Sequence, residues 1–307
     1  MFTLDGRCTG TYQHKPVIEA PNGLGSLTDS SGMVDSPREL CQRLEEDGYL
    51  FLPGFLDRDA VIEGRRSFLQ QLAEEDMLDP DAPLMDGIMA DGKNCAFVPK
   101  LAHQNKAVEA VIYSERMMAL FGMLFDEPAR HFDYTWVRAK GGKEGSEPTY
   151  PHYDNVYMGR GSKRLHTAWT PFGDIPYQMG GLMILEGSHR LQHLIDTYGQ
   201  YDVDGVCSNL GSQPMPRTWP GGFGWYKSDA FEVQQEFGGR WLTSEYRMGD
   251  VLIFGMFTMH ASMDNQTDRV RLSTDSRYQP AQDPVDNRWV GENPLGHGEA
   301  GRKEYIC

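Results

Sequence analysis

The chain has 307 residues, of which 39% are hydrophobic and 24% are charged, the composition of a globular protein with enough length to bury a sizeable core. Its 44 acidic residues outnumber the 29 lysines and arginines and give a formal net charge of −15. Nucleic acids and anionic membranes are bound through basic contacts to phosphate, so we expect neither partner and attribute the acidity to solubility. A locally basic pocket for a small molecule is compatible with this charge.

The cysteine pattern and the N-terminal residues indicate the cellular compartment in which we expect the protein. The five cysteines are scattered, odd in number and form no C-x-x-C pair: Cys8, Cys41, Cys95, Cys207 and Cys307. This pattern indicates reduced thiols. Residues 1–6 lack the basic and apolar regions of a signal peptide. No apolar stretch reaches the roughly 18 residues of a membrane span. We therefore expect a cytoplasmic protein; its oligomeric state is not predicted.

The first third of the chain reads as an extension followed by helices. Residues 1–34 are polar and contain glycine and proline, which predicts an irregular N-terminal arm. Serine, proline and glutamate in residues 36–39 mark a helix start, and Gly48 ends that helix. A short buried strand is expected over residues 49–52. A second helix is expected over about residues 57–75, from its apolar periodicity.

The remainder is rich in strands. Residues 77–98 are predicted to form a loop, and two helical patterns follow it, over about 107–113 and 115–125. Strand patterns then cover residues 131–140, 165–170, 251–254, 258–262 and 270–278. Short strands between Gly/Asp turns, with helices gathered in front, predict a mostly β fold with flanking helices. The specific expectation is a double-stranded β-helix, a cupin-like jelly roll.

We expect a single domain over residues 35–280 and an irregular C-terminal tail over 281–307. Within the domain, about residues 198–239 form an insertion with many prolines and glycines interleaved with aromatic residues. Loops of this length are usually functional or disordered, and the aromatic residues argue against disorder. We interpret the insertion as a lid that shapes a substrate pocket. A pad packed on the outside of the barrel is the alternative.

A candidate metal site centres on His152 and Asp154. In an extended strand, residues two apart point to the same face, so an imidazole and a carboxylate would aim at one point. His260 can complete a set of two histidines and one carboxylate, the arrangement of non-haem Fe(II) oxygenases, which leaves positions open for substrate and oxygen. A His-x-Asp pair alone is a weak signal, because a surface histidine beside a solvated aspartate gives the same pattern.

Arg271 strengthens the interpretation. It lies on the strand pattern that follows His260 and shares a face of that strand with Ser273. A guanidinium there can form a bidentate pair with a carboxylate held beside the metal. A hydroxyl such as that of Ser262 or Ser273 can assist. A dicarboxylic cosubstrate suits this arrangement.

With these residues the chain resembles the phytanoyl-CoA dioxygenase family, whose members use Fe(II) and 2-oxoglutarate. The resemblance runs from about Leu40 to about Pro280. Besides the residues already named, four segments carry it: EDGYLFLPGFL (46–56), TAWT (167–170), GGLMILEGSH (180–189) and GDVLIF (249–254). One departure is the glycine pair at 180–181, where relatives carry a polar residue before the glycine. It concerns local loop geometry.

The resemblance implies further site residues and a reaction. Trp169 resembles the family tryptophan beside the cosubstrate. Trp136 aligns with a position lining the 2-oxoglutarate pocket, with core packing as the alternative. Lys100 aligns with a basic residue that can contact the cosubstrate, with a solvated lysine as the alternative. The implied reaction consumes O2 and 2-oxoglutarate, releases succinate and CO2, and oxidises a small organic substrate. Because related halogenases have a small residue in place of Asp154, the carboxylate favours hydroxylation, or a related oxidation such as desaturation, over halogenation.

Two other classes stay open from the residues. A non-enzymatic jelly roll could bind a metal or metabolite with the same ligands, and a zinc hydrolase also uses three ligands and a water. Arg271 has no evident role in a hydrolase. The identity of the substrate is not predicted, since family members act on acyl-CoAs, small zwitterions and natural products.

Overall fold

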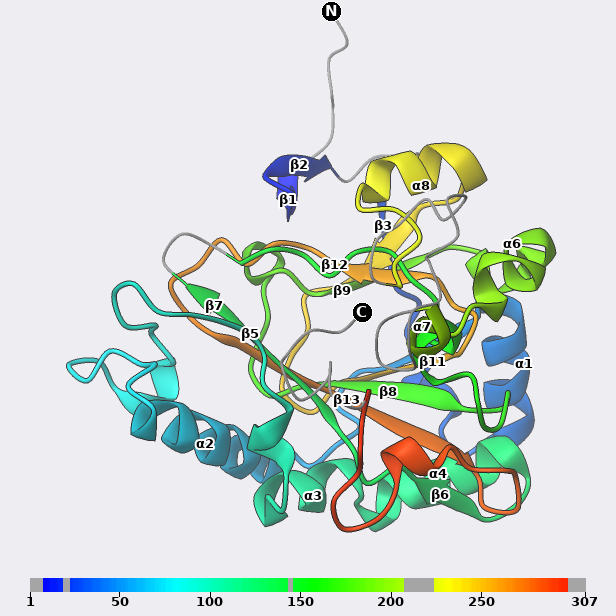
Figure 1. Ribbon diagram of the computed structural model, residues 1–307, viewed down its shortest axis with the longest axis horizontal. Coiled ribbons are helices and arrows are strands. Elements are labelled where there is room, and N and C mark those ends of the chain that lie inside the picture. Colours follow the sequence, from blue (N-terminus) through cyan, green and yellow to red (C-terminus); the bar gives the residue numbers. More distant parts are fainter. Residues whose placement is uncertain (1–7, 19–22, 143–145, 207–223, 298–307) are drawn as a thin grey trace, which may run out of the picture.

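Two β-sheets enclose the interior of the protein (Figure 1). The computed structural model describes residues 8–18, 23–142, 146–206 and 224–297. The larger sheet has the spatial order β4 (Tyr49–Leu52), β11 (Val251–Gly255), β8 (His166–Pro171), β13 (Arg271–Pro280), β7 (Trp136–Gly142) and β5 (Asn94–Phe97), and β6 (Ala129–His131) also pairs with β13. The smaller sheet has the order β12 (His260–Ser262), β9 (Leu182–Leu185), β10 (Trp241–Thr243) and β3 (Leu24–Ser26).

Apolar side chains of both sheets meet in one buried cluster. Phe51 and Leu252 come from the larger sheet, and Ile184 and Leu242 come from the smaller one. Each of these side chains is at most 6% exposed. The two sheets are therefore the walls of one jelly roll, and the predicted fold class is confirmed. Rigid strands also border the barrel mouth, where side chains of the site are fixed.

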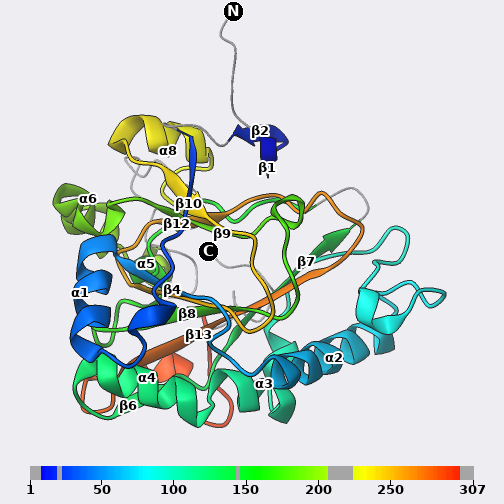
Figure 2. The ribbon, with the colours of Figure 1, turned by 180° about the vertical axis from the view of Figure 1, so that it is seen from behind.

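Helices cover the outer face of the larger sheet, as both views of the ribbon show (Figures 1 and 2). They are α1 (Pro37–Asp47), α2 (Arg58–Glu74), α3 (Lys106–Ile112) and α4 (Glu115–Phe125). The side chain of Asp57 accepts a hydrogen bond from the backbone N–H of Ala60 and caps α2. Phe68 of α2 packs edge-on against Phe172, with ring centroids 5.0 Å apart. The predicted second, third and fourth helices are thus confirmed.

The first helix starts at Pro37 as predicted, but by a different device. The Ser36 side chain accepts no capping hydrogen bond, so the serine-to-glutamate box does not form. The helix ends at Gly48, whose φ of 79° is in the left-handed region, and its N–H donates to the carbonyl of Leu44. A Cβ at Gly48 would lie 2.3 Å from Nδ1 of His189, so this close approach also requires glycine.

The prediction of an irregular N-terminal arm is wrong for the described part of residues 1–34. Strands β1 (Cys8–Tyr12) and β2 (Lys15–Ile18) form an antiparallel hairpin, and β3 runs parallel to β10 of the smaller sheet. Asp264 fixes the hairpin turn by accepting hydrogen bonds from the N–H groups of Gln13 and His14. The sequence lacked this signal because these strands are short and their partners lie far along the chain.

The prediction of a loop over residues 77–98 is wrong at its end. Residues Asn94–Phe97 form β5, the edge strand beside β7. The alternation there is too short to stand out, and pairing with β7 supplies the missing stabilisation.

The rest of the chain adds four short helices: α5 (Asn155–Met158), α6 (Gln192–Asp196), α7 (Val203–Val206) and α8 (Ala230–Phe237). Buried residues of α6 and α8 pack against β9 and β10 of the smaller sheet. Residues 198–239 are described up to 206 and again from 224, and the predicted lid aromatics Trp219 and Phe223 lie outside the described residues. The described tail residues have little regular structure beyond a 3-10 turn, Asn287–Trp289, but Trp289 is fully buried. Among the described residues, no helix has both the length and the apolarity to cross a bilayer.

Candidate metal centre and adjoining cavity

Three buried side chains converge at the barrel mouth. The Nε2 atoms of His152 and His260 lie 3.8 and 3.7 Å from Oδ1 of Asp154. The two imidazole rings are 4.1 Å apart between centroids. One ligand atom of each residue lies within 4.8 Å of those of the other two, so the three can hold a single metal ion. The structure thus brings together the predicted set of two histidines and one carboxylate.

The local backbone differs from the predicted strand. His152 forms an isolated antiparallel bridge with His260, and each donates its N–H to the carbonyl of the other over 3.1 Å. Asp154 has helical φ and ψ and immediately precedes α5. Same-face alternation along one strand therefore does not bring these ligands together. The bridge between two distant segments does so, and the turn into α5 brings Asp154 round to them.

Hydrogen bonds from the backbone set the orientation of both rings. Nδ1 of His152 lies 2.7 Å from the carbonyl oxygen of Tyr150, and Nδ1 of His260 lies 3.0 Å from that of Thr258. Since a carbonyl only accepts, each Nδ1 carries the proton and each Nε2 keeps its lone pair. This is how ligand histidines are held in metal sites.

The protonation states of His152, His260 and Asp154 suit the binding of a metal cation. Burial, followed by the neighbouring His260, lowers the pKa of His152 to about 3. Burial also lowers the pKa of His260, although Asp154 opposes the effect. For Asp154, burial alone would raise the pKa, but Arg277 and the two histidines outweigh it and lower the pKa well below its usual range. Near neutral pH the site presents two neutral imidazoles and one carboxylate.

Arg277 is a site residue that the sequence interpretation missed. Its Nη2 lies 3.2 Å from Oδ2 of Asp154, and both side chains are 2% exposed. Thr167, the register partner of Arg277 on β8, donates its hydroxyl to the same carboxylate. The alternation of Arg271, Ser273 and Arg277 along one strand was the available signal, since all three share a face of β13.

Arg271 lies on β13, fully buried, with Nη1 donating to the carbonyl of Gly180 over 2.5 Å. Burial, followed by Arg138, lowers the pKa of Arg271 to about 10. Within residues 8–18, 23–142, 146–206 and 224–297, its buried Nε has no hydrogen-bond partner, and neither has the buried hydroxyl of Ser273. The φ of Gly180 is 74°, and a Cβ there would lie 2.4 Å from the carbonyl oxygen of Asp264. The glycine at 180 therefore permits the turn whose carbonyl holds Arg271.

Lys140 lies directly opposite Arg271 in the register of β7 and β13. Its Nζ donates to the hydroxyl of Ser262 over 3.1 Å and to the carbonyl of Glu147 over 2.9 Å. Burial, followed by repulsion from Arg271, lowers the pKa of Lys140 well below its usual range. Within the described part of the chain, neither Lys140 nor Arg271 forms an ion pair. Two adjacent buried cations without a counter-ion are the physical signature of an anion site.

The two predicted tryptophans have different surroundings. Trp136 lines the cavity beside the triad, with the Arg277 guanidinium 4.6 Å from its ring centroid. Trp169 packs against Tyr246 in the cluster between the sheets, with centroids 4.6 Å apart, and does not line the cavity. Trp136 and Trp169 each lie opposite Asp275 in the register of neighbouring strands. Trp169 therefore shares the inner face of the larger sheet, but it packs in the cluster between the two sheets.

Lys100 does not reach the site. Its side chain is 59% exposed and its Nζ lies 2.7 Å from Oε1 of Glu75. The 3-10 turn Pro99–Ala102 that carries it packs against α2, outside the barrel. The prediction of Lys100 as a cosubstrate residue is therefore wrong in this structure, and the alternative of a solvated lysine holds. Lys140 is the buried lysine beside Arg271.

A cavity of about 410 Å³ opens beside His152 and Asp154. Its aromatic walls come from distant parts of the chain: Phe97, Trp136, Tyr150, Tyr157 and Trp225. Arg138, Lys140 and Glu147 give it charged walls, and His297 of the tail lines it as well. A cavity that combines aromatic walls with placed polar and charged groups is typical of a small-molecule site.

Comparison with known proteins agrees with this geometry. A sequence model of the phytanoyl-CoA dioxygenase (PhyH) family matches residues 44–273. The 1-deoxypentalenic acid 11-beta-hydroxylase of Streptomyces exfoliatus is 26% identical over 266 residues, covering 84% of this chain and 86% of the relative. The enzyme of that name from Streptomyces arenae is 26% identical over 267 residues, covering 82% and 84%.

Solved structures are similar as well. The epimerase SnoN, in complex with Fe3+, alpha ketoglutarate and nogalamycin RO, has a TM-score of 0.58 and 25% identity, covering 84% of this chain and 88% of SnoN. EctD from S. alaskensis, with 2-oxoglutarate and 5-hydroxyectoine, has a TM-score of 0.54 and 17% identity, covering 97% and 92%. The second likeness concerns the fold alone.

The fold and the buried set of ligands define a non-haem iron oxygenase of the 2-oxoglutarate-dependent class. The chain belongs to the phytanoyl-CoA dioxygenase family. It is an enzyme that uses Fe(II), O2 and 2-oxoglutarate to oxidise a small organic molecule, with release of succinate and CO2. The zinc hydrolase and the non-enzymatic barrel, which the residues alone left open, are set aside.

Proposed function

We propose that this enzyme hydroxylates a small, largely apolar organic molecule bound in the 410 Å³ cavity. In this proposal His152, Asp154 and His260 hold the iron. The distal carboxylate of 2-oxoglutarate is bound by Arg271 and Lys140. The observation that carries the proposal is the pair of adjacent buried basic side chains, Arg271 and Lys140, which form no ion pair with any residue that the structure describes; Lys140 lines the same cavity as His152 and Asp154.

The donor set fits iron. Two imidazole nitrogens and one carboxylate oxygen are the ligands of non-haem Fe(II) oxygenases, and the carboxylate balances part of the ion's charge. When bound, the iron supplies the O2 chemistry that side chains cannot perform. The protein's part is to hold the ligands. The backbone carbonyls at Tyr150 and Thr258 fix the rings, while Arg277 and Thr167 fix the carboxylate of Asp154.

The cosubstrate site fits a diacid. Arg271 offers an unpaired buried Nε, and Ser273 offers an unpaired buried hydroxyl. A carboxylate between Arg271 and Lys140 would satisfy these groups and neutralise the repulsion between the two cations. In a buried site such charge-assisted bonds are strong, because solvent does not screen them. Ser262 keeps the Lys140 ammonium in place, since its oxygen already accepts from Nζ.

The substrate end of the cavity selects for an organic scaffold rather than for a highly charged molecule. Tyr150 and Trp225 pack edge-on with ring centroids 5.0 Å apart, and Trp136 lines the cavity as well. These rings offer apolar surface and exclude water from the reacting position. Trp225 belongs to the insertion over residues 198–239, which supports the role of this insertion as a lid. The hydroxylases among the relatives and the carboxylate at Asp154 support hydroxylation as the outcome.

The test is a metabolite screen scored by stimulated succinate formation in aerobic buffer with Fe(II) and 2-oxoglutarate. The panel begins with 1-deoxypentalenic acid, named for the relatives, and continues through polycyclic terpenoids and aromatic polyketides. Mass spectrometry of each hit separates hydroxylation, which adds one oxygen atom, from desaturation or epimerisation, which add none.

A matched pair of lysine variants compares the buried lysine of the proposed cosubstrate site with an exposed lysine outside it. Lys140→Ala should weaken 2-oxoglutarate binding, since it removes one of the two cations, whereas Lys100→Ala should bind it normally. Equal 2-oxoglutarate affinity in the two variants would remove Lys140 from the proposal. If the protein binds 2-oxoglutarate but no compound of the panel stimulates succinate formation, the result would argue against a substrate of this class.

A further inference from the structure

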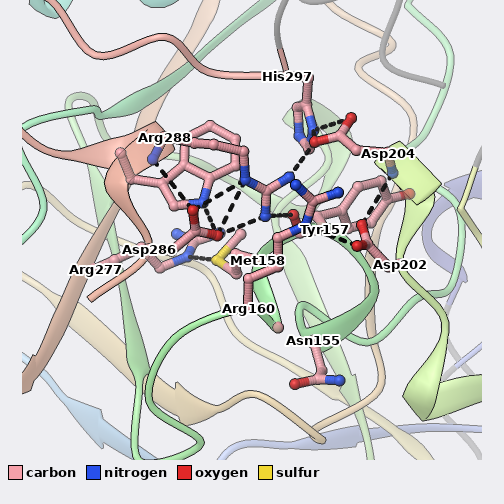
Figure 3. A network of polar contacts seen from close by, with 12 residues as sticks. Asn155, Tyr157, Met158, Arg160, Asp202, Asp204, Arg277, Asp286, Arg288 and His297 are labelled. Atoms are coloured by element: carbon pink, nitrogen blue, oxygen red, sulfur yellow. Dashed lines mark hydrogen bonds and ion pairs between the residues drawn. The ribbon is translucent and has the colours of Figure 1, made fainter. Parts of the chain in front are cut away.

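A polar network borders the cavity and ties three segments together (Figure 3). Arg288 of the tail donates to Asp204 of α7, to Asp286 over 2.5 Å and to the carbonyl of Tyr157 over 3.2 Å. His297, also of the tail, bonds to Asp204 from the other side. Asp204 is therefore the point where the insertion and the tail meet beside α5.

His297 lines the cavity, as Tyr157 does. Its side chain is 5% exposed, and its ring packs edge-on against Trp289 at 4.8 Å and Tyr157 at 6.0 Å between centroids. Nδ1 lies 3.1 Å from both carboxylate oxygens of Asp204. The other ring nitrogen, Nε2, is buried and has no hydrogen-bond partner among the residues that the structure describes.

The carboxylate fixes the tautomer of this ring. An ionised Asp204 only accepts, so Nδ1 of His297 carries the proton that faces it. In the neutral ring Nε2 then keeps its lone pair and is an acceptor. His297 resembles the two ligand histidines in that Nδ1 donates a hydrogen bond to the protein while Nε2 keeps its lone pair. The Nε2 atoms of His152 and His260 face Asp154, whereas that of His297 has no bonding partner in the described part of the chain.

We propose that His297 is a substrate-binding residue that accepts a hydrogen bond from a hydroxyl or N–H group of the substrate, and that Asp204 is its positioning residue. The proposal rests on the proposed function, because it concerns the molecule that enters the same cavity. It narrows the substrate to a scaffold with apolar or aromatic faces that carries one hydrogen-bond donor facing His297.

The cavity supports this class. Near His297 its walls include the rings of Tyr157 and Trp136 and the side chain of Met158, all largely apolar surface. A buried acceptor among such groups discriminates strongly in favour of a donor, because a ligand without one leaves the ring nitrogen unsatisfied. An apolar analogue of the same shape should therefore bind less tightly.

The experiment uses phenol and anisole as probes, which differ by the donor hydrogen. The full chain is labelled with nitrogen-15 histidine, loaded with Zn2+ as a diamagnetic metal, and saturated with 2-oxoglutarate. His297→Ala assigns the resonances of the residue by their loss. In the unsubstituted protein we expect a spectrum with the proton on Nδ1, a shift of the Nε2 resonance on titration with phenol, and no comparable shift with anisole. The donor should favour phenol by about fivefold in affinity.

Two carboxylate variants test the positioning role. Asp204→Asn removes the carboxylate that faces Nδ1, whereas Asp286→Asn alters the other carboxylate bound by Arg288 and leaves His297 untouched. We expect the fixed tautomer and the phenol preference to be lost in the first variant and kept in the second. Identical spectra in both variants would overturn the role of Asp204.

The comparison of phenol with anisole is made in the unsubstituted protein, and His297→Ala serves only to assign the resonances. An unshifted Nε2 resonance with phenol, or an equal response to anisole, would overturn the role of His297. Binding of 2-oxoglutarate to the same sample, measured by equilibrium dialysis, distinguishes the two proposals. Absence of that binding contradicts the proposed function, whereas binding with a silent His297 contradicts this inference alone.

Discussion

Arg277 and Asp154 form a buried ion pair across the barrel mouth, with Nη2 of Arg277 3.2 Å from Oδ2 of Asp154 and each side chain 2% exposed. The pair joins the central strand of the larger sheet to the carboxylate that completes the candidate metal site. Arg277 keeps the Asp154 carboxylate ionised and fixes its orientation. A metal ligand held in this way does not depend on the metal for its ionisation.

Arg277→Met is expected to reduce stability and iron affinity together. Removing one partner leaves Asp154 buried without its cation, a change that costs about 3–5 kcal/mol in typical proteins. Urea unfolding of the metal-free protein measures the first effect, and an anaerobic Fe(II) titration measures the second. The comparison is Arg58→Met, which removes an ion pair to Asp174 with both side chains about half exposed and should cost at most about 1 kcal/mol. Equal losses in the two variants would contradict the role of Arg277.

The metal-free protein is expected to lose stability as the pH falls from about 6.5 towards 4. Burial lowers the pKa of His152 to about 3, so the unfolded chain binds a proton in this range that the folded chain does not. Stability then rises with pH across the window, and the lowered pKa values of His260 and Asp154 act in the same direction. Urea midpoints measured in EDTA at several pH values check this.

His152→Gln should flatten part of that pH profile, because glutamine does not titrate. His103→Gln, at an exposed position, should leave the profile unchanged. A profile that keeps its full slope in His152→Gln would assign the acid sensitivity to other groups.

Arg271→Ala is expected to raise the 2-oxoglutarate concentration needed for half-maximal turnover by about ten- to a hundredfold, the range for a lost charge-assisted hydrogen bond. Iron binding should change little, because Arg271 contacts Gly180 rather than the triad. Arg269→Ala is the matched control on the same segment, since that arginine is exposed and pairs with Asp86. An unchanged cosubstrate requirement in Arg271→Ala would remove this residue from the anion site.

The sequence supported the triad and the fold because their signals are local or strongly patterned. Apolar periodicity predicted α2, and the strand pattern after His260 predicted that Arg271 faces inward. The predicted reason for the convergence of His152 and Asp154 was nevertheless wrong, since a bridge to His260 and a turn bring them together. The residue types were informative even though the local backbone was not foreseen.

Residues that depend on distant partners could not be predicted. Arg277 is 123 positions from Asp154, and His297 is 93 positions from Asp204. Nothing in the local pattern distinguishes Lys140, which faces a buried arginine, from Lys100, which faces solvent beside Glu75. Trp169 was placed on the correct face, but the depth of a residue in the barrel follows from sheet curvature and stagger.

His152→Ala and Asp154→Ala are each expected to abolish succinate formation, because either change leaves two ligands where the proposed iron site has three. Fe(II) titration under anaerobic conditions should show loss of the tight site in both variants, while circular dichroism should keep the signature of the folded barrel. His103→Ala is the matched histidine control, since this exposed residue lies outside the candidate site, and it should retain iron and turnover. Because His152 also bonds to Tyr150 and His260 through its backbone and ring, a modest fall in stability is expected as well. Full turnover in either ligand variant would contradict the assignment of this cluster as the iron site, whatever the similarity of the fold to known oxygenases.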